Sequence, residues 1–208
     1  MTSYTEQLET MITDERTALA DLLDQLPADA WDQPSLCAGW RIRETVAHIT
    51  MPFRYSMPKF LGEVMRSGGR FNVMADRCAR RDAARSPAEL AAEVRNNIAH
   101  PWSPPGGGRT GALAHDVIHT MDIATPLGID PHLPQGTLRT VLDTFTDGDS
   151  LKHFGTHLDG VRLAATDMDC SFGAGETVHG SARDLLSTLS GRALPLGHLT
   201  GATARLVH

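Results

Sequence analysis

The spacing of apolar residues constrains the fold of this chain more than any other feature. In four segments of the first 128 residues, apolar side chains recur every three or four positions, which is the repeat of an amphipathic α-helix. Proline and glycine separate these segments and end helices. We therefore expect a mainly α fold built on a four-helix bundle. The predicted helices run from Ser3 to Pro27, Ile42 to Ser67, Ser86 to His100 and Gly111 to Pro126.

Local signals mark the ends of these helices. The first and the third open with Ser3-x-x-Glu6 and Ser86-x-x-Glu89, which are capping patterns. Thr110 is expected to cap the fourth helix. Pro52 lies inside the second helix and should kink it, because proline has no N–H to donate to the carbonyl four residues earlier. Residues 70–86 have weak periodicity and five arginines, and this pattern predicts a connection with a partial helix.

The character of the sequence changes near residue 156. An amphipathic run over 138–145 precedes the change, and short strand-like runs at 161–166 and 176–179 follow it, around a Gly-Ala-Gly turn. A helix is expected over 182–189. We therefore predict two domains, a helical bundle over 1–155 and a small α+β domain over 156–208.

Composition excludes several classes of protein. The 208 residues include 19 Lys and Arg against 25 Asp and Glu, a net charge of −6, so a nucleic-acid partner is not expected. No apolar run is long enough to span a membrane, and the first residues are polar and acidic, unlike a secretory signal. We expect a cytoplasmic protein. The three cysteines, Cys37, Cys78 and Cys170, do not suggest disulfides or a cysteine-rich zinc site, and Cys37 is interpreted as a buried thiol in preference to a nucleophile.

The fourth predicted helix carries residues suited to binding a metal. Leu113, Val117 and Met121 fall on one face, and His115, His119 and Asp122 fall on the opposite one. Two histidines one turn apart can share one metal ion, and another helix must then supply a third ligand. The alternative is a solvated face that happens to carry two histidines. The spacing alone leaves both readings open.

The other histidines and the tryptophans are less informative. His48 lies beside the apolar stripe of the second helix, where a ligand and a hydrogen-bonded histidine are equally good readings. Gly155 separates His153 from His157 and should prevent them from stacking, so we predict no second metal site there. The three tryptophans are expected to be core anchors. Five further histidines lie near element ends or in loops and are assigned no role: His100, His132, His179, His198 and His208.

Three stretches of the sequence carry a resemblance to a known family. The first is Trp31 with Pro34-Ser35-Leu36-Cys37-x-Gly39-Trp40-x-Ile42-Arg43-x-x-x-Ala47-His48, the second is His119-x-x-Asp122-Ile123-x-x-Pro126-Leu127-Gly128, and the third joins Gly160-Val161-Arg162-Leu163 to Gly191-Arg192. Over nearly its whole length the chain closely resembles the mycothiol-dependent maleylpyruvate isomerase-like family, in the DinB-like superfamily.

This resemblance implies a DinB-like four-helix bundle that holds a divalent metal, commonly zinc. The implied ligands are His48, His115 and His119. The isomerase for which the family is named carries glutamate where His115 stands, and three neutral histidines leave the metal its full charge to acidify a bound water or thiol. The resemblance also points to Arg192 as an anion-binding residue from the small domain, and Asp122 would orient an imidazole from behind the ligands.

The leading hypothesis is a zinc-dependent enzyme that activates a low-molecular-weight thiol such as mycothiol. The thiol would be transferred to a small electrophilic substrate, or would catalyse its isomerisation. Two alternatives remain at this point: a non-catalytic protein that binds a metal or small ligand, and a hydrolase that uses metal-bound hydroxide. The sequence does not identify the substrate or the oligomeric state.

Overall fold

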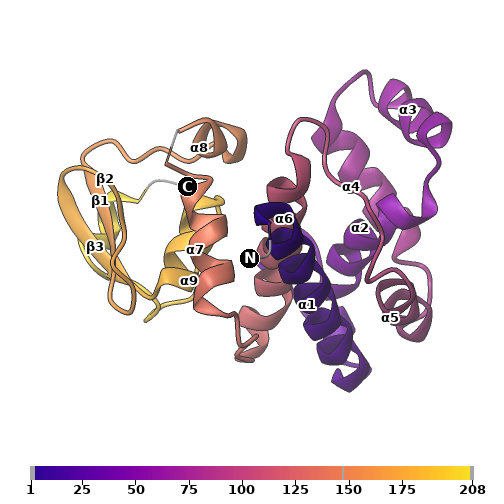
Figure 1. The fold of residues 1–208 in the computed structure, drawn as a ribbon, viewed down its shortest axis with the longest axis horizontal. Helices are drawn as coiled ribbons and strands as arrows, with labels where there is room; N and C mark the ends of the chain where they lie inside the picture. The colour runs from indigo at the N-terminus through magenta and orange to yellow at the C-terminus, as the bar shows by residue number, and fades with distance from the viewer. Residues whose placement is uncertain (1–2, 147, 207–208) are drawn as a thin grey trace. The chain divides into compact units, whose positions relative to one another are not determined.

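The computed structural model describes residues 3–146 and 148–206. The chain forms two compact units, one that ends at Pro131 and one that begins at His132 (Figure 1). The first unit is helical, and the second combines helices with a small four-stranded sheet. The predicted mainly α fold with a small C-terminal α+β part is confirmed.

Four helices of the first unit form the predicted bundle. They are α1 (Tyr4–Gln25), α2 (Ile42–Arg54), α5 (Pro87–Asn96) and α6 (Gly108–Ala124). Helices α1 and α2 each pack against both α5 and α6. In Figure 1 the indigo α1 lies beside α6. Each of the four helices therefore packs against two of the others.

Two of the three predicted caps are present. Ser3 and Ser86 each accept a hydrogen bond from the backbone N–H three residues later, and the glutamate there accepts one in return. The predicted cap at Thr110 is wrong. Helix α6 begins at Gly108 with Gly107 as its N-cap, so Thr110 lies inside its first turn and no side chain caps it.

The prediction of one long, kinked helix from Ile42 to Ser67 is also wrong, because the chain forms two helices there. Helix α2 contains Pro52 and ends at Arg54, and α3 (Met57–Arg66) follows two residues later. A continuous helix would lose a second backbone bond at Pro58, whose ring would clash with the carbonyl of Arg54. The chain restarts instead, so that Pro58 lies in the first turn of α3, where no N–H partner is needed.

The arginine-rich segment forms a full helix, α4 (Phe71–Asp82), and is more than the predicted connection. Arg77 and Arg81 extend to Glu63 of α3, with N–O distances of 2.5 and 2.8 Å. Glu63 is 3% exposed. The charges that suggested an irregular segment are therefore paired with a neighbouring helix, and local periodicity does not reveal such pairing.

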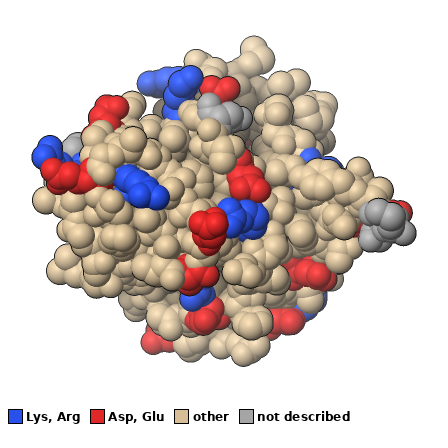
Figure 2. Space-filling model, turned by 60° about the vertical axis from the view of Figure 1, so that its left-hand side comes forward, with Lys and Arg blue, Asp and Glu red and all other residues tan. Residues whose placement is uncertain are grey.

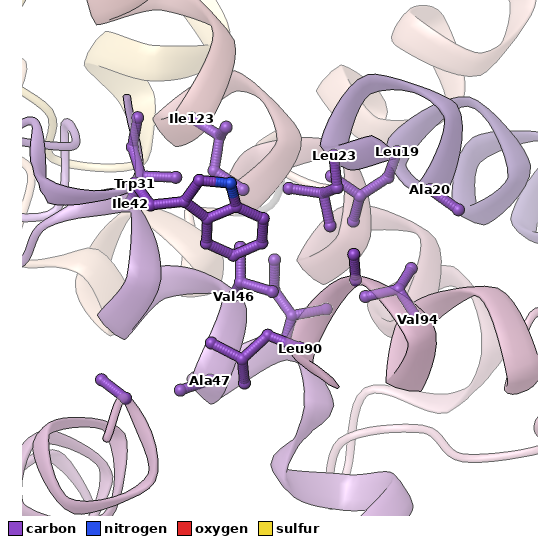
Figure 3. Close-up of a cluster of buried hydrophobic side chains, with 13 residues drawn as sticks. Leu19, Ala20, Leu23, Trp31, Ile42, Val46, Ala47, Leu90, Val94 and Ile123 are labelled. Carbon is purple, nitrogen blue, oxygen red and sulfur yellow. The ribbon is translucent and has the colours of Figure 1, made fainter. Parts of the chain in front are cut away.

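A cluster of apolar side chains fills the middle of the first unit (Figure 3). Trp31 anchors it from a short 3₁₀ turn (Ala30–Asp32) and is 2% exposed, as expected of a core tryptophan. Fully burying one leucine, isoleucine or valine side chain of such a cluster contributes about 1.5–3 kcal/mol to stability. We call this set the apolar cluster: Leu19, Ala20, Leu23, Trp31, Ile42, Val46, Ala47, Ile49, Ala83, Leu90, Ala91, Val94 and Ile123.

The second unit is built on a sheet with strand order β2-β1-β3-β4. The central strand β1 (Val161–Ala165) pairs antiparallel with β2 (Ser171–Gly173) and parallel with β3 (Glu176–Gly180). Strand β4 (Thr200–Gly201) pairs antiparallel with β3. Strands β1 and β3 match the two predicted runs, whereas β2 and β4 are too short to produce a recognisable alternation.

A glycine allows the chain to cross from one side of β1 to the other. Only Ala174 and Gly175 separate β2 from β3. Gly175 has φ of +132°, and a Cβ atom there would lie 2.1 Å from the carbonyl oxygen of Gly160. No residue with a side chain fits at this position. The Gly-Ala-Gly motif of the sequence is explained by this crossing.

The division into units differs from the boundary expected near residue 155. Helices α7 (Gln135–Asp143) and α8 (Asp149–Phe154) lie in the second unit. Helix α7 packs against α9 (Ala182–Leu189), and the ring of Phe145 stacks on that of Phe154 with centroids 5.7 Å apart. The apolar run at 138–145 therefore serves the core of the C-terminal unit.

Charged side chains of both signs are interspersed on the face shown in Figure 2. Many charged side chains of the described residues form ion pairs, such as Arg95 with Asp21 and Asp24, at 2.6 Å each. Within the described part of the chain, no helix combines the length and the hydropathy that crossing a membrane requires.

Candidate functional site

Three histidines from two helices of the first unit come together. His48 lies in α2, and His115 and His119 lie one turn apart on α6. Each offers a ring nitrogen within 4.8 Å of those of the other two. Their ring centroids are between 4.7 and 5.4 Å apart. The structure thus brings together the three residues that were predicted as ligands.

The polar face of α6 is buried, so the alternative of a solvated face does not hold. His119 is 9% exposed and Asp122 is 1% exposed, while Leu113 and Val117 on the other face are fully buried. Helix α6 is enclosed because it packs against both α1 and α2. Its polar side chains must therefore find partners inside the protein.

Two aspartates of α6 provide such partners for the histidines. Nδ1 of His119 lies 2.8 Å from Oδ2 of Asp122, and Nδ1 of His115 lies 3.0 Å from Oδ1 of Asp116. A carboxylate that accepts from Nδ1–H fixes the tautomer and presents Nε2 to a metal. Asp122 therefore occupies the orienting position that the sequence suggested. Asp116, its counterpart behind His115, was not predicted.

Asp116 is itself held by a buried arginine. Nε of Arg16, on α1, lies 2.7 Å from Oδ2 of Asp116, and both side chains are at most 2% exposed. Burial alone would raise the pKa of Asp116, but hydrogen bonds and charge from His115 and Arg16 outweigh it and hold this pKa below its ordinary value. The sequence signal was a charged residue in the apolar stripe of α1, between Ile12 and Leu19.

Two of the three tryptophans pack against the histidines and are not core anchors. The ring of Trp40 lies 5.2 Å from that of His48, and the ring of Trp102 lies 5.0 Å from that of His115. Trp40 is fixed by a hydrogen bond of 2.8 Å from Nε1 to Asp76. Both indoles are partly exposed. Their rings contact two of the three histidines, one tilted and one edge-on.

Cys37 lies beside this group, in the loop before α2. Its Sγ is 3.0 Å from Oδ2 of Asp122 and 3.9 Å from Nδ1 of His119. These three side chains form a second group whose ligand-type atoms lie within 4.8 Å of one another. The thiol is half-buried and not fully buried as expected, and its contact with Asp122 was not predicted.

Residues 12–100 match the sequence model of the mycothiol maleylpyruvate isomerase N-terminal domain. This segment belongs to that family. It contributes His48, Cys37 and Trp40 to the site described above. His115 and His119 lie beyond the matched residues, on the helix that completes the bundle.

Two solved structures share the fold over the full length of the chain. One is the mycothiol-dependent maleylpyruvate isomerase, with a TM-score of 0.63, 14% identity, and coverage of 100% of this chain and 98% of that one. The other is a histidine-to-alanine mutant of that isomerase, with a TM-score of 0.60 and the same identity and coverage. At this identity the likeness shows the fold, including that of the C-terminal unit. No match was found among curated proteins.

Arg192 lies in the C-terminal unit, directly after α9. Its guanidinium donates to the carbonyl of Ser190 and lies 5.7 Å from the ring centroid of Phe154. Its predicted role as an anion-binding residue stays a prediction.

Two of the remaining described histidines, His153 and His198, have contacts with nearby side chains. Helix α8 ends at Phe154, and Gly155 adopts φ of +68°, so His153 and His157 do not share a helix. That they bind no metal stays a prediction. Nδ1 of His198 lies 2.7 Å from Oδ1 of Asp184, and His208 lies outside the described residues.

Proposed function

We propose that this protein is a metal-dependent enzyme in which His48, His115 and His119 hold a zinc ion that binds a low-molecular-weight thiol. The thiol, of the mycothiol type, is transferred to a small electrophile or catalyses its isomerisation. The observation that supports this most strongly is the convergence of three histidines, two of which have Nδ1 engaged by buried aspartates.

The donor set fits zinc. Structural and catalytic zinc sites use imidazole nitrogens at about 2.0–2.1 Å, and three protein ligands leave one position for an exogenous ligand. Nitrogens that share one zinc lie about 3.3 Å apart, which is compatible with the observed limit of 4.8 Å after small side-chain rotations. Carboxylates behind the histidines complete the usual arrangement of such a centre.

The chain's own residues prepare this chemistry. Asp116 and Asp122 accept from Nδ1–H of His115 and His119, which fixes the tautomer that presents Nε2 to a metal. Trp40 and Trp102 pack against two of the three histidine rings. When bound, the zinc ion supplies the positive charge that lowers the pKa of a thiol and so generates the thiolate at neutral pH.

The type of thiol and reaction rests on similarity. The matched domain family and both solved structures are described as mycothiol-dependent maleylpyruvate isomerases. We therefore propose mycothiol as the thiol and a small electrophile as the substrate, in a cytoplasmic enzyme. Arg192 is proposed to bind a carboxylate of thiol or substrate through its planar pair of donors.

A second candidate is a hydrolase that uses metal-bound hydroxide. Three neutral donors leave the metal its full charge, which favours ionisation of water as well as of thiol. The two candidates use the same centre and differ in their exogenous ligand. A protein that binds metal without catalysis would share the centre and lack both activities.

Metal analysis and calorimetry test the proposal. Protein purified without an affinity tag should contain about one zinc per chain, and replacing any of the three histidines with alanine should sharply lower this content. Mycothiol should bind the metal-loaded form, more tightly as pH rises toward the free thiol pKa of about 8.5, because binding releases the thiol proton.

Metal-stripped protein is the control, and Arg192→Ala should weaken binding of thiol or substrate without loss of metal. Equal thiol binding by stripped and loaded protein contradicts the thiol enzyme. Zinc-dependent hydrolysis without thiol binding would favour the hydrolase. Retention of zinc by all three alanine variants would contradict the ligand set.

A further inference from the structure

One oxygen of Asp122 is shared between an imidazole and a thiol. Oδ2 lies 2.8 Å from Nδ1 of His119 and 3.0 Å from Sγ of Cys37. Asp122 is 1% exposed, so water does not substitute for either donor. The thiol S–H and the imidazole N–H therefore converge on the same acceptor.

The loop that carries Cys37 holds Asp122 at two points. The backbone N–H of Leu36 donates to the carbonyl oxygen of Asp122 at 3.0 Å, and the next residue supplies the thiol to its carboxylate. The loop is fixed in turn by Ser35, whose Oγ accepts from the N–H of Cys37 at 3.2 Å and from Oγ1 of Thr45 at 2.9 Å. Adjacent loop residues thus hold the backbone and the side chain of one aspartate.

The distances distinguish a hydrogen-bonded thiol from a metal ligand. Sulfur, nitrogen and oxygen atoms bound to one tetrahedral zinc lie roughly 3.3–3.6 Å apart, given zinc–ligand bonds of about 2.0–2.3 Å. The two distances to Oδ2 are 2.8 and 3.0 Å. They are shorter than this, and each is a hydrogen bond to the carboxylate oxygen. The geometry favours a thiol that donates to Asp122 over one that binds metal.

We propose that Cys37 is a positioning residue for the zinc centre, acting on His119 through Asp122. This inference rests on the proposed function. With two donors on Oδ2, the carboxylate is fixed in orientation, so it holds the ring of His119 with Nε2 directed to the metal. Without the thiol, Asp122 is held by one donor fewer and rotates more freely, and His119 loses part of its preorganisation.

The test is the zinc affinity of the full-length protein, measured by competition with a chelator. Cys37→Ala should weaken zinc binding about tenfold, the lower end of the range for groups that support a ligating histidine. Cys37→Ser keeps a donor and should stay within about twofold of the wild type. Cys170→Ala removes a half-buried cysteine from the C-terminal unit and should leave affinity unchanged.

The absorption spectrum of the cobalt-substituted protein reports on the metal ligands directly. It would not change if Cys37 only stabilised the fold. Cobalt-loaded wild type should lack a thiolate-to-cobalt charge-transfer band, while Cys37→Ala should shift the ligand-field bands and Cys37→Ser should restore them. A charge-transfer band that disappears in Cys37→Ala would overturn the inference by making Cys37 a ligand. Unchanged zinc affinity in Cys37→Ala would overturn it as well.

The outcomes separate this inference from the proposed function. Wild-type protein that binds no zinc would contradict the proposed function itself. Wild-type protein that binds zinc with the same affinity as Cys37→Ala would contradict only the role of Cys37. Thermal unfolding of the metal-free variants shows whether Cys37→Ala is folded. If it is not, Cys37→Val, which also lacks a donor, provides the test.

Discussion

Two buried regions of the first unit use the same helices in opposite ways. The apolar cluster takes Leu19 and Leu23 from α1 and Ile123 from α6. A second region, which we call the polar chain, takes buried charged and imidazole groups from the same two helices. Its members are Glu15, Arg16, His115, Asp116, His119 and Asp122. Each helix thus contributes apolar side chains to the apolar cluster and polar side chains to the region around the candidate centre.

The two regions differ in what burial does to stability. Removing apolar surface from water is favourable in proportion to its area. A buried ion pair such as Arg16 with Asp116 gains little net stability, because the desolvation of both charges offsets their attraction. The polar chain therefore contributes little to folding, and its presence is explained by the centre that it orients. Four predictions test this contrast.

The largest effect is expected in the polar chain. Asp116→Ala leaves Arg16 buried without its carboxylate, so the metal-free protein should lose about 3–5 kcal/mol in free energy of unfolding. Urea denaturation measures this loss. The double variant Arg16→Met with Asp116→Leu should regain most of it, since neither charge is then buried. A loss below about 1 kcal/mol in the single variant would show that Arg16 is not left as a buried, uncompensated charge.

A substitution in the apolar cluster should lower the stability of the protein and leave its zinc content unchanged. Leu90→Ala removes a fully buried side chain of α5 and should cost about 3 kcal/mol through lost burial and the cavity that remains. Its zinc content should equal that of the wild type, because Leu90 does not belong to the polar chain. Denaturation and metal analysis of the same preparation check both parts, and loss of zinc in the folded variant would contradict the separation of the two regions.

Glu15 should make stability depend on pH. Burial raises its pKa to about 7, and a hydrogen bond from Thr120 only partly opposes this shift. Because the folded state binds the proton more tightly than the unfolded state, stability should fall by up to about 3 kcal/mol as pH rises from about 4.5 to 7.

Replacing Glu15 isolates this contribution. Glu15→Gln is neutral at every pH and should be more stable than the wild type above pH 7, with the difference vanishing near pH 4. Denaturation of both proteins across this range measures the difference. A constant offset between the two curves would contradict ionisation of Glu15 as the cause.

The smallest effect is expected at a helix end. Ser86→Ala removes the cap of α5, the helix that carries Leu90, and should cost about 1 kcal/mol. Ser86→Asp keeps a capping oxygen and should stay close to the wild type. Thermal unfolding compares the three proteins, and a loss as large as that of Leu90→Ala would mean that the cap supports the apolar cluster directly.

Features of the fold that depend on residues close together in the sequence could be predicted, and features that depend on contacts between distant residues could not. The starts of α1 and α5 follow from capping patterns within four residues, and both are confirmed. Helix α4 was missed because its arginines are satisfied by Glu63, which belongs to another helix. The break after Arg54 was missed because a long apolar period concealed the restart at Pro58.

The candidate centre shows the same limit. His115 and His119 share a helix face, so their spacing indicates that they lie together, and resemblance to a family added His48. Arg16 and Trp102 join the site only through the packing of other elements, which no local pattern describes. Asp116 was adjacent to His115 in sequence, but nothing local distinguished it from an exposed charge.

The enclosure of α6 has a consequence for motion. Its backbone amides lie between α1 and α2, so they should exchange with solvent mainly when the whole first unit opens. The backbone that carries the two imidazoles is therefore expected to open rarely. Most of the entropic cost of arranging them is met when the chain folds, before any ion arrives.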